Sequence, residues 1–107
     1  MNLKSLQEKV SEGRSKEYYQ ITTPQEKEIL TMTVKLNEEV GELCNDILSI
    51  LKLQRKSKLE KFDKRNIYQE FADVVLTTLQ LASSAKVDIE RAVEDKIKII
   101  EQRNNKK

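Results

Sequence analysis

Glycine and proline are nearly absent from this chain, which has two glycines and one proline among 107 residues. Tight turns, β-hairpins and bulges depend on these two residue types, so a fold of short strands joined by such turns is disfavoured. The content of 36% charged and 37% hydrophobic residues is typical of long amphipathic helices. The composition therefore predicts an all-α fold, and the length fits a single domain, residues 1–107, with one core.

Charge and hydropathy argue against two classes of partner. A formal net charge of +2 is too small to indicate nucleic-acid binding. No stretch approaches the roughly 18 consecutive apolar residues of a membrane span, and the amino-terminal residues lack the apolar run of a signal peptide. We therefore expect a cytoplasmic protein that associates with neither nucleic acid nor membrane.

Histidine is absent from the sequence. Its absence removes imidazole general bases, Ser-His-Asp triads and most zinc sites from consideration. The one cysteine, Cys44, has no partner for an intramolecular disulfide and no imidazole to activate its thiol, so we expect it in the core. Carboxylates remain as the residues able to act as ligands or bases.

Helix boundaries are predicted from capping signals and apolar periodicity. The clearest start has Thr23 as N-cap, Pro24 at the first helical position and Glu26 three residues after the cap. Asp88 is a second predicted N-cap. The expected helices cover residues 2–20 with a break near Gly13, 24–53, 66–85 and 89–103, which we expect to form a four-helix bundle.

Apolar stripes indicate which helix faces should be buried. The expected core positions are Leu36, Val40, Leu43, Ile47, Ile50 and Leu51 in the second helix, Phe71, Val75, Leu79 and Ala82 in the third, and Val93, Ile97 and Ile100 in the last. Further apolar residues of the second helix lie outside its stripe, which favours an oligomer: Leu30, Met32, Val34, Leu48 and Leu53.

Two acidic pairs border these stripes, Glu39 with Glu42 and Glu70 with Asp73. Residues three apart lie on one face of a helix, so two antiparallel helices could bring four carboxylates together. An all-oxygen site of this kind suits a hard divalent cation. We expect no lysine or arginine on the acidic strips. The alternative is that these acids lie on ordinary solvated helix faces.

Gly41 interrupts the first acidic pair in mid-helix, where glycine costs about 1 kcal/mol relative to alanine. Close approach of another backbone or a ligand would explain it, and a tolerated surface glycine is the alternative.

The acidic motifs also carry a family resemblance. The run LNEEVGEL, residues 36–43, followed by EFADVVL, residues 70–76, resembles the E-E-x-x-E then E-x-x-D signature of the MazG-like all-α nucleoside triphosphate pyrophosphohydrolases. The two motifs are separated by 27 residues, between Glu42 and Glu70. The resemblance covers roughly residues 25–103.

The resemblance implies an enzyme that hydrolyses a nucleotide between its α and β phosphates, giving a monophosphate and pyrophosphate. It assigns Glu38 as an accessory carboxylate that orients or deprotonates the attacking water or contacts a further metal. It assigns the ligands of Mg²⁺, with Mn²⁺ as a possible substitute, to Glu39, Glu42, Glu70 and Asp73. It further implies a homodimer or homotetramer in which a neighbouring subunit helps to build the site.

Lys96 resembles the lysine that relatives use to hold phosphates, although Ile100 stands where they carry an asparagine. Its alternative is an ordinary cation near a helix C-terminus. Tyr18 and Tyr19 could stack on a base or simply pack. The basic segment 52–65 could hold a polyanion or serve as a solvated connection.

Two other functions remain open at this stage. One is phosphoribosyl-ATP pyrophosphohydrolase, the related activity of histidine biosynthesis, in which the same bond is cleaved in a different substrate. The other is a non-catalytic helical interaction module whose acidic faces stay solvated. Metal binding distinguishes the module from the two enzymes.

Overall fold

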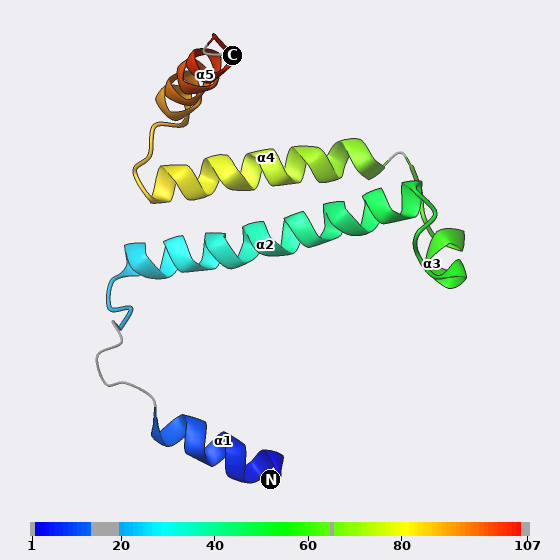
Figure 1. Cartoon of the computed structure of the whole chain (residues 1–107), viewed down its shortest axis with the longest axis vertical. Coiled ribbons are helices and arrows are strands. Elements are labelled where there is room, and N and C mark those ends of the chain that lie inside the picture. The colour runs from blue at the N-terminus through cyan, green and yellow to red at the C-terminus, as the bar shows by residue number, and fades with distance from the viewer. Residues whose placement is uncertain (1, 14–19, 65, 106–107) are drawn as a thin grey trace.

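The computed structural model describes residues 2–13, 20–64 and 66–105, and these contain helices and no strand, which confirms the all-α class. Figure 1 shows a long central pair of helices with shorter elements at its ends. The five helices are α1 (Leu3–Glu12), α2 (Pro24–Ile50), α3 (Lys56–Glu60), α4 (Asn66–Ser84) and α5 (Ile89–Asn105).

Capping residues set most of the boundaries where the sequence predicts them. The Thr23 hydroxyl accepts a hydrogen bond from the Glu26 amide at 3.1 Å, and the Glu26 carboxylate accepts one from the Thr23 amide at 3.1 Å. This capping box satisfies two amides that the first turn of a helix leaves unpaired. The Asp88 carboxylate likewise accepts from the Arg91 amide at 3.2 Å at the start of α5. The predicted N-caps are therefore confirmed.

Two helix ends follow from backbone conformation. Lys52 and Lys86 both have φ of 59°, the left-handed region that terminates a helix. As a result α2 ends at Ile50, three residues before the predicted end, and α4 ends at Ser84, one residue before it. The short helix α3 lies within the basic segment 52–65, which the sequence predicts as a connection between helices.

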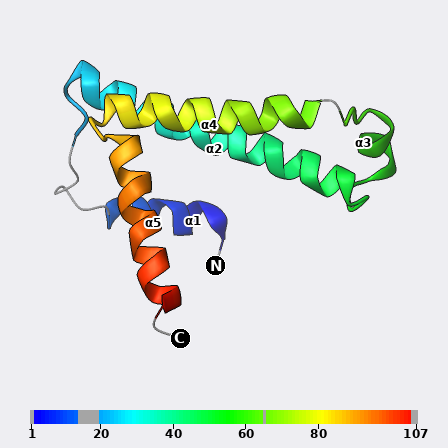
Figure 2. The same ribbon diagram turned by 90° about the horizontal axis from the view of Figure 1, so that it is seen from above.

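Helices α2 and α4 run antiparallel and lie side by side in both views (Figures 1 and 2), and they form the one extensively packed pair among the described helices. The packed face of α4 includes buried Thr77 and Ala82, and that of α2 includes buried Glu39. The half-buried apolar residues that accompany them are Ile29, Met32, Leu36, Leu43, Ile47, Ile67, Val74 and Leu81. The core of the described chain is therefore the single interface between α2 and α4.

The prediction of burial is wrong for several residues of this chain. Phe71, Val75 and Leu79 are 52%, 55% and 43% exposed, because α4 turns its acid-bearing face towards α2. The predicted stripe of α5 and part of that of α2 are also exposed: Val93, Ile97, Ile100, Val40, Ile50 and Leu51. Cys44, expected in the core, is exposed as well.

The chain exposes far more surface than a compact domain of its size. Its radius of gyration is 20.3 Å, whereas a compact chain of this length has about 13 Å. Its accessible surface is 9795 Å², and a compact monomer of this mass would expose about 6,200 Å². Among the described helices, none combines the length and the apolar run needed to cross a membrane.

Candidate metal centre

Three carboxylates converge in the middle of the α2–α4 seam. Glu39 comes from α2, and Glu70 and Asp73 come from one face of α4, because a spacing of three places them one turn apart. One carboxylate oxygen from each of the three residues lies within 4.8 Å of the other two. Glu39 is only 6% exposed, so this acidic cluster reaches into the packed interface.

Some oxygens of these acids lack hydrogen-bond partners. Within the described part of the chain, the buried atoms without a partner are Glu39 Oε2, Glu70 Oε2 and Asp46 Oδ2. Burying a charged oxygen without a partner is unfavourable, and native proteins rarely leave one unsatisfied. A cation bound by the group of three would satisfy the Glu39 and Glu70 oxygens. The donor set consists of oxygen alone, which fits Mg²⁺ or Mn²⁺.

Electrostatics in the cluster point the same way. The pKa of the Glu70 carboxyl is raised above its ordinary value, first by burial and then by the negative charges of Asp46, Glu42, Asp73 and Glu39. Each cause disfavours the ionised form. A cation among these groups would relieve the repulsion.

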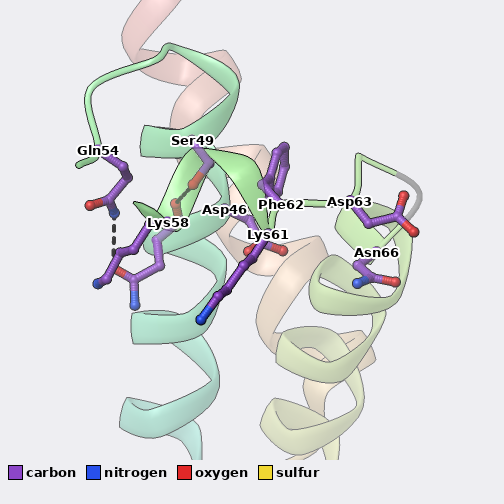
Figure 3. A pocket seen from close by; sticks show the side chains of 9 residues that line it. Asp46, Ser49, Gln54, Lys58, Lys61, Phe62, Asp63 and Asn66 are labelled. Atoms are coloured by element: carbon purple, nitrogen blue, oxygen red, sulfur yellow. Dashed lines mark hydrogen bonds between the residues drawn. The ribbon is translucent and has the colours of Figure 1, made fainter. Parts of the chain in front are cut away.

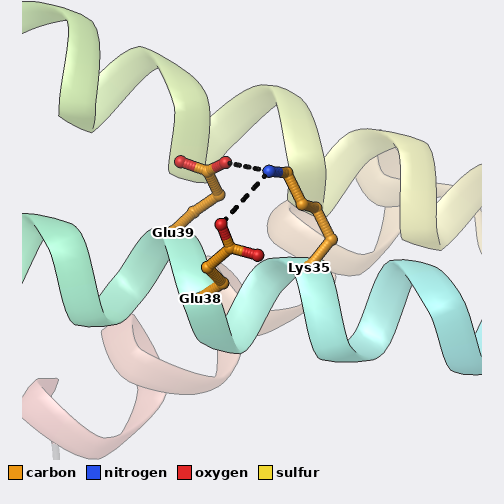
Figure 4. Close-up of polar contacts among 3 residues, drawn as sticks. All are labelled: Lys35, Glu38 and Glu39. Atoms are coloured by element: carbon orange, nitrogen blue, oxygen red, sulfur yellow. Dashed lines mark ion pairs between the residues drawn. The ribbon is translucent and has the colours of Figure 1, made fainter.

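Among the described residues, Lys35 forms ion pairs with acids of α2. The prediction that the acidic strips lack basic residues is therefore wrong for α2. The Lys35 ammonium lies 3.1 Å from Glu39 Oε1 and 3.5 Å from Glu38 Oε1 (Figure 4). The pKa of Lys35 is raised, chiefly by its hydrogen bond to Glu39 and next by the charge of Glu38. The signal was present in the sequence, since Lys35 precedes these acids by three and four positions.

The remaining predicted site residues lie at or beyond the edge of this cluster. Glu42 is exposed and outside the group of three, although its charge helps to raise the pKa of Glu70. Glu38 is half-exposed and held by Lys35. Lys96 is on α5, which extends away from the end of α4 and does not pack along the α2–α4 pair (Figures 1 and 2). The single chain therefore does not bring Lys96 to the acids.

Asp46 was not predicted as a site residue. It lies one turn after Glu42 on the same acidic strip, which was the available signal. Gly41 has nothing within 4 Å of the position of a Cβ atom, so no other segment of the described chain approaches it closely. Tyr18 and Tyr19 lie outside the described residues.

A cavity of about 280 Å³ opens beside the cluster, between the last turns of α2, α3 and the start of α4 (Figure 3). Asp46 belongs to both places, because it lines the cavity and its charge acts on Glu70. The full lining consists of Asn45, Asp46, Ser49, Gln54, Lys58, Lys61, Phe62, Asp63 and Asn66.

Comparison with known families shows to which family the chain belongs. The sequence model of the MazG nucleotide pyrophosphohydrolase domain matches residues 27–107, about three quarters of the chain. The chain belongs to the MazG family. The match spans every acid of the cluster and also Lys35, Asp46 and the cavity. Comparison with curated proteins gave no match, and comparison with solved structures gave none.

MazG membership confirms the resemblance carried by the two acidic motifs. The family description is that of nucleotide pyrophosphohydrolases, which are hydrolases. The acidic cluster is consistent with the divalent metals that such enzymes use.

Proposed function

We propose that this MazG protein is a magnesium-dependent pyrophosphohydrolase that cleaves a ribo- or deoxynucleoside triphosphate to the monophosphate and pyrophosphate. The observation that carries the proposal is the convergence of Glu39, Glu70 and Asp73 within 4.8 Å, with buried unpartnered oxygens, inside the region matched by the family. Mn²⁺ would be an acceptable substitute, because it shares the preference for oxygen ligands.

Different residues of the chain would hold the metal and orient the water. Glu39, Glu70 and Asp73 would hold the metal from two helices, and Glu42, at the edge, would complete the set of carboxylates. When bound, Mg²⁺ supplies neutralisation of the phosphate oxygens and a more acidic water. Glu38 shares the Lys35 ammonium with Glu39 (Figure 4), and its half-exposed carboxylate could orient an incoming water.

We further propose that the working unit is a homodimer or homotetramer. The protomer exposes about 3,600 Å² more than a compact monomer of its mass would, and obligate subunit interfaces bury areas of this order. The uncovered stripe of α4 supplies an apolar surface for a second copy, with Phe71, Val75 and Leu79 each at least 43% exposed. In such an assembly, Lys96 of one subunit would contact phosphate in the site of another.

Pyrophosphate release from a panel of ribo- and deoxynucleoside triphosphates tests this function. Wild-type protein should release pyrophosphate with Mg²⁺ and stop when EDTA is added. Asp73→Asn should lose the activity, whereas Glu28→Gln should retain it, because Glu28 is an exposed acid of α2 outside the cluster.

The panel also separates the alternatives. Phosphoribosyl-ATP is included, so that cleavage of this compound alone would identify the related activity. Failure of the folded wild-type protein to cleave any substrate, together with no stabilisation by Mg²⁺, would contradict the proposal and favour a non-catalytic module.

A further inference from the structure

The cavity beside the acidic cluster joins two regions of opposite charge. Its inner wall is Asp46, whose buried oxygen lacks a partner and whose charge reaches Glu70. Its outer wall carries Lys58 from α3 and Lys61 immediately after α3. Both Asp46 and Lys61 line this cavity (Figure 3).

The two lysines have no other evident task. Neither forms an ion pair with a described residue, since the salt bridges found in that part of the chain involve Lys35 and Arg91. Lys58 and Lys61 are three positions apart and line the same cavity. They therefore place two ammonium groups over one concave surface, which the carboxylates of Asp46 and Asp63 also line.

Most of the remaining lining is polar, with Phe62 as its apolar member, and two hydrogen bonds hold part of it in place. The Gln54 amide donates to Asn45 Oδ1 at 3.3 Å, which ties the loop after α2 back to the helix (Figure 3). The Ser49 hydroxyl donates to the Asn45 carbonyl at 3.0 Å. Asn66 adds a further amide at the start of α4. These groups supply neutral donors beside the lysines.

A ligand of this cavity must carry negative charge to bind the two lysines. It must also carry a divalent cation to bind the carboxylates. A polyphosphate chelated to Mg²⁺ has this chemistry, because its oxygens bind both ammonium groups and the metal. The volume of about 280 Å³ lies near the lower end of the range for small-molecule sites. It suits one part of a nucleotide rather than the whole molecule.

We propose that this cavity binds the β and γ phosphates of the nucleotide, with Lys58 and Lys61 as their contacts. The inference rests on the proposed function, because it uses the metal cluster as the place of bond cleavage. It orients the substrate along the hairpin: the leaving pyrophosphate lies towards α3, and the nucleoside lies on the opposite side of the cluster, towards the start of α2.

Binding of magnesium pyrophosphate, measured by isothermal titration calorimetry at about 0.15 M salt to limit long-range effects, tests the proposal. Lys58→Gln and Lys61→Gln should each weaken binding about tenfold, the scale of one charge-assisted hydrogen bond. Lys56→Gln is the matched control, because Lys56 is on the same helix and does not line the cavity. Binding of nucleoside monophosphates should be unchanged in all three variants.

Three results would overturn the proposal. The first is that wild-type protein does not bind magnesium pyrophosphate. The second is that the Lys58→Gln and Lys61→Gln variants bind it as tightly as the Lys56→Gln control. Weaker monophosphate binding with intact pyrophosphate binding would instead assign the cavity to the nucleoside half.

Failure of the proposed function is detected separately on the same samples. It would appear in the wild-type protein as no Mg²⁺-dependent rise in melting temperature and no pyrophosphate release. The lysine variants should keep the Mg²⁺-dependent rise, because neither lysine belongs to the acidic cluster.

Discussion

Replacing Glu70 by glutamine should stabilise the metal-free protein. Removing one member of an ion pair usually destabilises a protein. The charged neighbours of Glu70, however, carry the same negative charge as Glu70 itself. The amide is nearly isosteric with the carboxylate and removes the charge while keeping the shape. The substitution therefore isolates the repulsion within the acidic cluster.

The size of the effect follows from the geometry. Two unit charges 4.8 Å apart repel by about 1 kcal/mol at the dielectric constant of water and about 3.5 kcal/mol at an effective value of 20. Glu70 takes part in two of the three pairs formed with Glu39 and Asp73. Partial exposure of Glu70 and the ion pair of Lys35 with Glu39 reduce this repulsion. We therefore expect a gain of about 1–2 kcal/mol, or about 4–8 °C in melting temperature.

The gain should depend on pH in a defined direction. The pKa of Glu70 is raised in the folded state, so folding favours the protonated carboxyl. The penalty is absent below the ordinary glutamate value of 4.5, where Glu70 is protonated in both states, and it is complete above the raised folded-state value. The free energy of unfolding of Glu70→Gln should thus exceed that of wild type most near neutral pH and should equal it in acid.

Thermal unfolding followed by far-UV circular dichroism at fixed protein concentration measures the effect, first in EDTA and then with Mg²⁺. Wild-type protein should gain stability with Mg²⁺, and Glu70→Gln should lose most of that response. Glu28→Gln, an exposed acid outside the cluster, should behave as wild type in both conditions. A Glu70→Gln protein that is less stable than wild type in EDTA near neutral pH would refute the repulsion argument.

Three further substitutions have expected outcomes. Thr23→Ala should lower the free energy of unfolding by about 1 kcal/mol, because it removes the cap hydroxyl bonded to the Glu26 amide; unchanged urea denaturation would contradict this. Gly41→Ala should raise it by about 0.5–1 kcal/mol, since the added methyl group meets open space in mid-helix; a loss would show that an assembly partner approaches there. Lys35→Met should destabilise the metal-free protein and tighten Mg²⁺ binding, because it removes the cation that competes for Glu39; calorimetry showing weaker Mg²⁺ binding would rule out competition.

Local features of the sequence predicted the helices well. The Thr23 capping box and the Asp88 cap begin α2 and α5 where expected, because capping depends on atoms a few positions apart. The scarcity of glycine and proline was sufficient for the all-α class. The spacing of Glu70 and Asp73 was sufficient to place them on one face of α4, since helical periodicity is independent of the partner.

The sequence alone determined helices α2, α4 and α5, the caps of α2 and α5, and the pairing of acids within each helix, because these depend on interactions within one or two turns. The tertiary structure decided which face of α4 meets α2, so that the acid-bearing face is packed and the stripe containing Phe71 remains exposed. It also decided the register that sets Glu39 against Glu70 and Asp73, and it brought Asp46 into the same electrostatic environment. Both choices depend on the summed packing of surfaces from distant segments, which no local spacing in the chain encodes.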